Sequence, residues 1–391
     1  MKHSRNSFYF VLGMLGTVVS LLLWRAACVG WPELDAAGVA AAFLVLPWLF
    51  VVPHTLAAHL PLPFVRLLGR VGGYAFFALY DGLVLLVPFG ALWLISLAPP
   101  LAAMRGELLR GFVWFAAAVF AVWVAAGILW GHHHHVRRVT VETEKPIPRP
   151  FTVAFASDIH LGVSMGPAVA RQLVRDMNAL TPDLILLGGD IIDGELGVVL
   201  REKSLQALAG MQASWGVCAV LGNHDHYGSD VRQEKDLLIA AGIRVLSGER
   251  LVVAPGVRVA GWLDVIYHTE ADNRASLARS DAKEGTGQAA GTAAGAPFDI
   301  VIEHEPVRMA QAAQAGADLY FAGHTHAGQF WPNRLLVRRV FPFDYGTRLF
   351  GCMTAIVTSG YGAWGGQYRI GPAPEIVLVE VRSASSKKSV Q

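Results

Sequence analysis

Four long apolar segments precede residue 135, and no other feature limits the fold of this chain so strongly. They cover about Ser7–Cys28, Ala37–Val52, Val71–Ala98 and Gly111–Trp130. Most of them reach the ~20 residues that an α-helix needs to cross a bilayer. Because three more segments follow the first, we interpret the first as a membrane helix and not as a cleaved signal peptide. We therefore predict a transmembrane region of about four helices over residues 1–135.

The basic residues between these segments predict how the chain is oriented. One side of the membrane would carry Lys2, Arg5, Arg66, Arg70, Arg137 and Arg138. The other side would carry Arg25, Arg105 and Arg110 beside the acids Glu33, Asp35 and Glu107. Since short cytoplasmic loops are enriched in Lys and Arg, both ends of the chain are expected in the cytoplasm. We expect an integral protein of a bacterial inner (plasma) membrane, with the part of the chain after residue 135 in the cytoplasm.

Two polar features of this region have more than one interpretation. Asp81 is the one carboxylate inside an apolar segment, and such acids are functional candidates by default. We favour a span that begins at Gly82, which would leave Asp81 at the interface. The four histidines of residues 132–135 could bind a metal, but we favour a simple location in the headgroup zone.

The pattern of the chain changes after residue 135. Residues 136–150 are polar and contain three prolines, which is typical of an extended linker. From residue 151, short apolar runs alternate with helical stretches, which predicts an α/β domain over 151–382. Residues 269–297 are rich in Ala, Gly, Ser and charge and are predicted to form a mobile insertion. The polar tail, residues 383–391, is expected to be disordered.

Individual elements of this domain can be assigned from the pattern. The runs expected as strands include Thr152–Ala156, Leu184–Leu187, Val217–Leu221, Ile300–Ile302, Leu319–Ala322 and Ala355–Val357. Helices are expected at Pro167–Leu180, Leu200–Ala213, Asp230–Ala241 and Pro306–Ala315.

The overall composition argues against several classes of site. A formal net charge of +2 is not that of a chain whose main partner is nucleic acid. The three cysteines are far apart and indicate neither a disulfide framework nor a zinc site. The chain has no Gly-x-x-x-x-Gly-Lys-[Ser/Thr] loop, so nucleotide binding of that type is not supported.

Five polar clusters follow apolar runs of the predicted α/β domain. They are Ser157-Asp158-Ile159-His160, Gly188-Gly189-Asp190-Ile191-Ile192-Asp193, Gly222-Asn223-His224-Asp225, Glu303-His304-Glu305-Pro306 and Gly323-His324-Thr325-His326. Ligand sites in such domains lie beyond the carboxyl ends of the strands. Residues i and i+2 of an extended segment point the same way, so Asp158 can converge with His160, and His324 with His326. One such cluster could be only a polar turn, but five in order favour a binding site.

The residue types in these clusters indicate the kind of ligand. Carboxylates, imidazoles and an amide oxygen suit hard or borderline divalent metals. There are too many donors for one ion. Two ions about 3.5–4 Å apart, bridged by one carboxylate, would use them all.

The same series resembles the motifs of the calcineurin-like metallophosphoesterase superfamily. The continuation Gly328-Gln329 and the membrane-attached amino end resemble its branch that includes YkuE-type phosphoesterases and some UDP-diacylglucosamine hydrolases. The resemblance covers about residues 150–380. It implies an α/β fold of two packed mixed β-sheets flanked by helices.

The resemblance also implies a role for each motif residue. One divalent ion would be held by Asp158, His160 and His326, the other by Asn223, His304 and His324, with Asp190 as the bridge between them. His224 would be the catalytic histidine, oriented by Asp193. The two ions (Mn, Fe, Zn or Mg) would provide a bridging hydroxide that hydrolyses a phosphoester or pyrophosphate. The branch often has glycine where this chain has Ala327, so the substrate loop is expected to differ slightly.

The residues after His326 point to the class of substrate. Between Gln329 and Arg348, aromatic residues are mixed with arginines, the composition of a surface at a headgroup boundary. The alternative is that the aromatics pack in the domain core and the arginines are solvated. We favour a lipid-linked or amphipathic phosphate substrate, with membrane lipids as further partners.

Two other functions are compatible with a membrane region joined to such a domain. A sensor or transporter could bind phosphate ligands there without physiological turnover, and a structural protein could carry a degenerate domain. Since all seven presumed ligands and His224 are present, we favour the enzyme.

Overall fold

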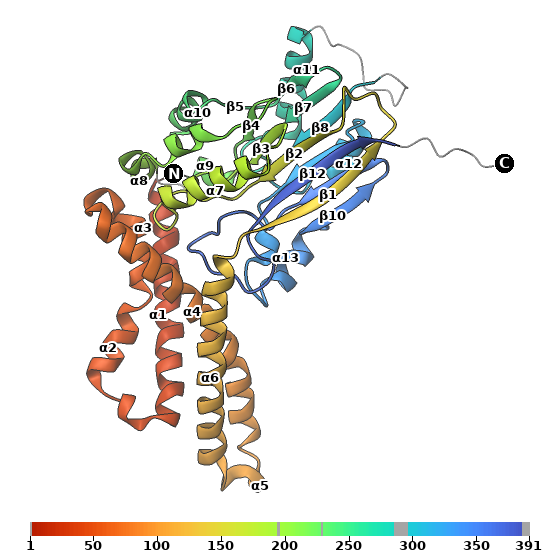
Figure 1. The fold of residues 1–391 in the computed structure, drawn as a ribbon. Helices are drawn as coiled ribbons and strands as arrows, with labels where there is room; N and C mark the ends of the chain where they lie inside the picture. Colours follow the sequence, from red (N-terminus) through yellow and green to blue (C-terminus); the bar gives the residue numbers. More distant parts are fainter. Residues whose placement is uncertain (1, 194–195, 228–229, 285–295, 385–391) are drawn as a thin grey trace, which may run out of the picture. The chain divides into compact units, whose positions relative to one another are not determined.

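A computed structural model describes residues 2–193, 196–227, 230–284 and 296–384, and it divides into two compact units. The helical unit comprises Met1–His132 with Gly365–Ile370. The α/β unit comprises His133–Trp364 with Gly371–Gln391. The chain therefore contains the expected apolar helical region and the expected α/β domain (Figure 1). One short segment from the second half of the sequence, Gly365–Ile370, belongs to the helical unit.

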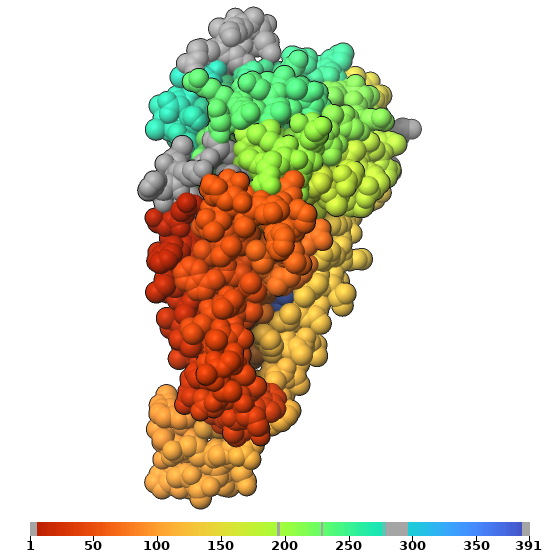
Figure 2. Space-filling view, turned by 90° about the vertical axis from the view of Figure 1, so that its left-hand side faces the viewer, coloured from red at the N-terminus to blue at the C-terminus, as the bar shows by residue number. Residues whose placement is uncertain are grey.

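The helical unit is built from a few long apolar helices and short connecting pieces. Its elements are α1 (Lys2–Gly30), η1 (Pro32–Leu34), α2 (Ala37–Val45), α3 (Trp48–Leu56), η2 (Ala57–His59), α4 (Leu62–Ile95), α5 (Pro99–Ala102) and α6 (Arg105–Gly131). Helices α1, α4 and α6 contain the stretches that are long and apolar enough to cross a membrane. Figure 2 shows the joined surface of α1, α2 and α3 in red to orange.

The second of the four expected spans is bent. Helices α2 and α3 meet at an angle of 41° across a short break that contains Pro47. Proline has no backbone N–H, so Pro47 cannot continue the hydrogen-bond ladder of α2, which ends at Val45. The described residues therefore hold three candidate spans, or four if this bent pair crosses as one.

Segment Gly365–Ile370, distant in sequence, packs among these helices at glycines. A side chain on Gly127 would overlap the ring of Tyr368, and one on Gly73 would overlap the carbonyl of Gly365. The Tyr368 ring stacks on Phe77 with centroids 5.1 Å apart, and the backbone N–H of Arg369 donates to the Gly127 carbonyl at 3.0 Å. Only glycine allows backbone and ring to approach a helix this closely.

Asp81 lies inside a continuous helix and not at its start. Helix α4 begins at Leu62, so the expectation that the helical span begins at Gly82 is not met. No residue between Leu62 and Gly82 interrupts the helix, because proline occurs there only in its first turn. The Asp81 side chain is fully buried and accepts a hydrogen bond from the Tyr368 hydroxyl.

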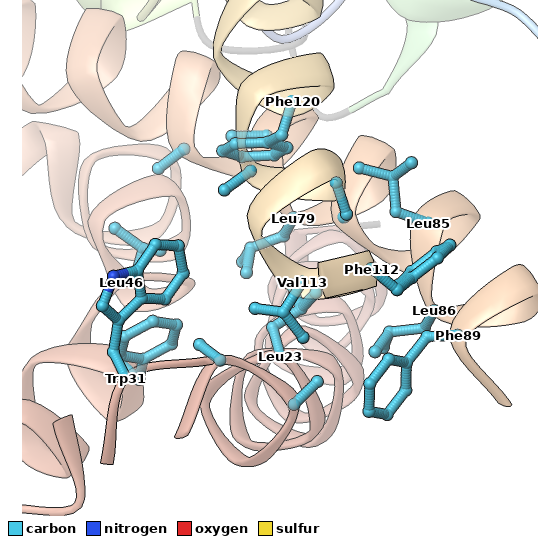
Figure 3. A pocket seen from close by; sticks show the side chains of 18 residues that line it. Leu23, Trp31, Leu46, Leu79, Leu85, Leu86, Phe89, Phe112, Val113 and Phe120 are labelled. Carbon is cyan, nitrogen blue, oxygen red and sulfur yellow. The ribbon is translucent and has the colours of Figure 1, made fainter. Parts of the chain in front are cut away.

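An apolar cavity of about 350 Å³ lies between α1, α2, α4 and α6 of the helical unit. Leu23, Leu79, Phe112 and Phe120 are among the side chains that line it (Figure 3). Apart from the indole of Trp31, the labelled side chains carry only carbon, so the lining is almost entirely apolar.

The α/β unit contains two six-stranded mixed sheets (Figure 1). The first has the order β1 (His135–Thr143), β12 (Glu375–Ser383), β2 (Phe151–Ala156), β3 (Leu184–Gly188), β4 (Val217–Val220) and β5 (Ile243–Val245). The second has the order β10 (Gly346–Phe350), β11 (Met353–Val357), β9 (Leu319–Ala322), β8 (Phe298–Ile302), β7 (Val257–Gly261) and β6 (Glu249–Ala254). Strands β2 to β5 run parallel, as do β7, β8, β9 and β11.

The two sheets pack face to face, and helices cover their outer faces. The shared core includes Phe155 and Leu186 from the first sheet and Ile300 and Phe321 from the second. The flanking elements are α7 (Pro167–Ala179), α8 (Leu196–Glu202), η3 (Leu205–Gly210), α9 (Asn223–His226), α10 (Val231–Ala240), α11 (Glu270–Glu284), α12 (Met309–Gln314), η4 (His326–Gly328) and α13 (Arg334–Val340). Central parallel strands covered on both faces are apolar throughout, which explains the continuous apolar runs in the sequence.

The stretch expected as a linker forms an edge strand over most of its length. Strand β1 pairs in parallel with β12 from His135↔Glu375 to Thr143↔Ser383. Its polar composition hides the strand because every second side chain faces outward. Among these residues, the partly buried Arg137 forms an ion pair with the buried Glu375 at 3.0 Å. The linker prediction is therefore wrong for residues 136–143.

Two further boundaries differ from the expectation. Helix α11 occupies the first half of the stretch expected as a mobile insertion, and residues 285–295 lie outside the described part of the chain. Strand β12 extends to Ser383, and residues 385–391 also lie outside it.

Candidate metal centre

The motif residues gather where strands of both sheets end. Strands β2, β3 and β4 of the first sheet lead into Asp158, Asp190 and Asn223, and β8 and β9 of the second lead into His304 and His324. Five of the seven presumed ligands adopt the left-handed backbone conformation: Asp158 (φ 56), His160 (φ 53), Asp190 (φ 50), His324 (φ 67) and His326 (φ 48). Such strain in non-glycine residues is concentrated at functional sites.

The first group of donors is Asp158, His160 and His326. Their ligand atoms lie within 4.8 Å of one another, and all three side chains are buried. Nε2 of His160 lies 3.0 Å from Nε2 of His326, which lies 3.5 Å from Oδ1 of Asp158. Two imidazole nitrogens and a carboxylate oxygen that point at one place are arranged as ligands of a cation.

The second group of donors surrounds the amide oxygen of Asn223. Nε2 of His304 and Nδ1 of His324 both lie 3.0 Å from Asn223 Oδ1 and 3.2 Å from each other. Nδ1 of His304 donates to the carbonyl of Gly188 at 2.8 Å. This backbone contact fixes the ring and directs its Nε2 toward the other donors.

Asp190 lies between the two groups. Its Oδ2 is 3.2 Å from Nε2 of His304 and 3.8 Å from Nε2 of His160. Its Oδ1 accepts from the backbone N–H of His224 at 2.8 Å. Although burial opposes its ionisation, the imidazoles of His304 and His224 hold the pKa of Asp190 well below its usual range. An ionised carboxylate that reaches both groups can bridge two cations.

Glycines make room for these donors. A side chain on Gly222 would overlap Oδ1 of Asp190, and one on Gly323 would overlap Ser157 and Asp158. These overlaps explain why a glycine precedes Asn223 and His324 in the sequence.

His224 faces the centre but has a carboxylate partner of its own. Its Nδ1 lies 2.8 Å from Oδ1 of Asp193, and its ring is perpendicular to that of His160 with centroids 4.8 Å apart. Together with His160 and Asp190 it also offers a ligand atom within 4.8 Å, so geometry alone allows a metal contact. Burial opposes the imidazolium, but Asp190 and Asp193 outweigh it and raise the pKa of His224 to about 9.

The protonation states of two other imidazoles suit metal binding. Burial and neighbouring imidazoles lower the pKa of His160 to about 4 and that of His324 to about 3. Both rings are therefore neutral near pH 7, as a ligand must be. The donor set of carboxylate, imidazole and amide groups fits two divalent cations.

Two other features singled out in the sequence are the histidines of residues 132–135 and Ala327. The histidines of the 132–135 run do not converge: His132 Nδ1 contacts the Ile128 carbonyl, His134 stacks on Tyr361, and His135 contacts Glu375. Ala327 has φ 51, a conformation that glycine adopts more easily.

Sequence reasoning missed several residues that support the centre. Asp225 accepts the backbone N–H groups of Ile192 and Gly222, at 2.9 and 2.8 Å, and so ties two ligand loops together. The Asn223 amide donates to the Tyr227 hydroxyl at 2.9 Å. Asp225 is the last residue of the motif Gly222-Asn223-His224-Asp225, and this position could have indicated a role. Tyr227 offers no comparable signal.

Comparison with known proteins agrees with this geometry. Residues 151–328 match the family model described as calcineurin-like phosphoesterase. An uncharacterized metallophosphoesterase of Aquifex aeolicus (strain VF5) is 30% identical over 255 residues, which are 63% of this chain and 91% of that protein. The metallophosphoesterase YkuE of Bacillus subtilis (strain 168), also uncharacterized, is 26% identical over 58% of this chain and 77% of its own length.

A relative with membrane segments is also similar. A transmembrane protein with metallophosphoesterase domain from Danio rerio is 29% identical over 231 residues, which are 58% of this chain. The match spans only 52% of that protein, about half of its length.

Proposed function

The chain belongs to the calcineurin-like metallophosphoesterase family, and we propose that it is a membrane-anchored phosphoesterase with a dinuclear metal centre. The observation that carries the proposal is the convergence of two donor groups on either side of Asp190. Asp158, His160 and His326 would hold one divalent ion, and Asn223, His304 and His324 the other. Bound there, the two ions would activate water near neutral pH and neutralise phosphate oxygens.

His224 is proposed as the catalytic group that acts on the phosphate. Asp193 accepts from its Nδ1, so Nε2 of the imidazolium carries the proton that can be donated to the leaving oxygen. Asp193 would keep the ring in this orientation and stabilise its positive charge.

The proposed substrate is a lipid-linked or amphipathic phosphoester or pyrophosphate. Two features support it: the chain carries apolar helices long enough to span a membrane, and exposed arginines follow the last metal-ligand motif. Some aromatic residues of that stretch pack in the domain core, and others lie at the surface or beside the metal centre. Phe343 is buried in the core, whereas the Phe341 ring contacts the ring of His324 at 5.4 Å and Trp331 is half exposed.

Turnover by the purified full-length protein tests the proposal. After metal removal, the protein should hydrolyse bis(p-nitrophenyl) phosphate only when Mn²⁺, Zn²⁺, Fe²⁺ or Mg²⁺ is restored. A protein that binds two metals but turns over neither this diester nor phosphomonoesters nor pyrophosphates would be a sensor or binding protein. Asp236→Asn, a change at an exposed position on α10, is the matched control for changes at Asp190.

We further propose that the α/β unit lies on the cytoplasmic side of a bacterial inner membrane. The Lys and Arg distribution supports this orientation. With both chain ends inside, the number of crossings must be even, so the bent pair α2–α3 would cross as one broken span. Reporters fused before Met1 and after Gln391 should both be active only as cytoplasmic reporters. Opposite results at the two ends would make the bent pair a re-entrant loop.

A further inference from the structure

The segment between Trp331 and Leu349 exposes an unusual share of large apolar side chains. The described part of the α/β unit exposes eleven of them, and five lie in this segment: Trp331 50%, Leu335 55%, Leu336 59%, Val340 72% and Leu349 70%. Helix α13, at its centre, buries no residue. A concentration of this kind marks an interaction surface, because single exposed apolar residues are usually scattered.

The exposed apolar residues of α13 share one side of the helix with a cation. With about 100° between successive residues, Leu336 and Val340 lie one turn apart, and Leu335 lies above Arg339 in the same arc. Arg334 and Arg338 point the other way, toward Asp344, at 2.9 and 4.0 Å. We call Leu335, Leu336, Arg339 and Val340 the α13 face.

This face is held firmly to the metal-ligand turn. The side chain of Asn333 donates to the Gly328 carbonyl at 3.1 Å, and Thr325 donates to the Asp344 carbonyl at 2.6 Å. A Cβ atom on Gly328 would meet the backbone of Arg334 at 2.5 Å, so the turn and the helix are in close contact. The α13 face is therefore presented by the residues that directly follow His326.

The charges of the segment indicate what covers the face. From Gln329 to Cys352 the chain has four arginines and one acid, Asp344, which is buried and paired. Arg338, Arg339 and Arg348 are exposed. Exposed leucine and valine beside the exposed cations Arg339 and Arg348 are complementary to a bilayer surface that carries anionic lipid.

The chain also keeps this unit near a bilayer. Only three residues separate the end of α6, a candidate span, from the start of β1 at His135. Such a connection reaches about 14 Å when fully extended. We propose that the α13 face docks on the anionic membrane surface and brings the metal centre to substrates that remain in the lipid layer. The docking stands alone, whereas the delivery of substrate rests on the proposed phosphoesterase function.

Lipid contact can be measured without any turnover. The probe is introduced as Leu336→Cys in full-length protein that also carries Cys28→Ser and Cys352→Ser. The new cysteine is labelled with a polarity-sensitive fluorophore. The labelled protein is then reconstituted into phosphatidylcholine vesicles with or without phosphatidylglycerol. The matched control is Ile239→Cys, an equally exposed apolar site on α10. We expect quenching by spin-labelled lipid at residue 336, stronger with phosphatidylglycerol, and none at 239. Equal signals at the two sites would overturn the docking.

Delivery of substrate is tested by turnover on two substrates. Leu336→Glu with Val340→Glu should lower hydrolysis of a lipid phosphoester in vesicles at least about tenfold, while hydrolysis of bis(p-nitrophenyl) phosphate stays within about twofold. Ile239→Glu should change neither rate. Equal loss on both substrates would overturn the delivery role. If the unmodified protein hydrolyses neither substrate, the phosphoesterase proposal fails, and the quenching experiment still decides the docking.

Discussion

Asp190 and Asp81 are both buried carboxylates, one in each unit, but their surroundings have little in common. Asp190 lies among imidazole nitrogens of His160 and His304 and accepts from the His224 backbone. Asp81 accepts one hydrogen bond from Tyr368, and its Oδ1 has no hydrogen-bond partner among the described residues. The first carboxylate is at the centre of many donors, and the second is nearly alone.

The comparison shows that burial by itself does not identify a metal ligand. A buried carboxylate is costly wherever it lies, and the cost can be met by one hydroxyl or by a set of cations. What distinguishes Asp190 is that two groups of three donors lie on either side of it. This difference predicts opposite consequences for the same chemical change at the two positions.

The largest effect is expected for Asp190→Asn. The change keeps the shape of the side chain but removes the negative charge that would bridge the two cations. Turnover should fall below detection, and the metal content of the purified protein should drop below two per chain by elemental analysis. Asp236→Asn should retain full metal content and activity. Near-normal turnover of Asp190→Asn with two bound metals would show that Asp190 is not the bridge.

The second largest effect is expected for His224→Ala. Because His224 already has Asp193 as its partner, the variant should keep both metals and lose about 10²–10⁴-fold in turnover, as for a lost general acid. His226→Ala is the control, since His226 contacts the Gly222 carbonyl and stacks on Tyr267. Loss of metal from the His224 variant would make this residue a ligand.

The pH dependence of turnover separates Asp193 from His224. The imidazolium of His224 is the active form, so activity should be retained below its pKa and fall as the pH rises through it. Asp190 and Asp193 raise that pKa to about 9, and bound cations would oppose the contribution of Asp190. Asp193→Asn should therefore move the alkaline limb of the profile to lower pH. If the alkaline limb did not move, the ionisation that it reports would not be that of His224 paired with Asp193.

Much of the fold could be predicted because the central strands leave a simple signal. The run Leu184–Leu187 lies within β3 and Leu319–Ala322 matches β9, since strands buried on both faces are apolar at every position. Strand β1 could not be predicted, because it is an edge strand whose polar residues alternate and whose partner, β12, is more than 200 residues away. The helix expected over Leu200–Ala213 is divided because Lys203 adopts φ 56 and ends α8.

The candidate site was predictable as a set of residues but not as a network. Strand ends meet at one edge, so the donors of five loops could be assigned to one place from order alone. Contacts such as Asp225 to the Ile192 backbone depend on how two loops are packed against each other, which the spacing of residues does not encode. Segment Gly365–Ile370 shows the same limit, because no periodicity indicates that it belongs with the helical unit.

A smaller effect is expected for Tyr227→Phe, which alters only the support of one donor. The Tyr227 hydroxyl accepts from the Asn223 amide, and this contact turns the amide oxygen toward His304 and His324. A neutral hydrogen bond of this kind is worth about 1 kcal/mol, so metal affinity should fall roughly fivefold while turnover at saturating metal is little changed. Tyr267→Phe is the matched control. A large loss of turnover at saturating metal would place Tyr227 in contact with the substrate.

The smallest effect on turnover is expected for Asp81→Asn, the counterpart of the change at Asp190. The asparagine oxygen can still accept from Tyr368, and the variant no longer carries an acid within a helix that is a candidate membrane span. Turnover and metal content should stay within about twofold of the unmodified protein. Tyr368→Phe removes the hydroxyl that donates to Asp81, the one donor to this side chain among the described residues. This change should instead lower the thermal midpoint of the detergent-solubilised protein by a few degrees. If Asp81→Asn abolished turnover while leaving the thermal midpoint and both metals intact, the acid would have a function of its own. The contrast between Asp190 as a metal-binding carboxylate and Asp81 as a carboxylate without a role in turnover would then be wrong.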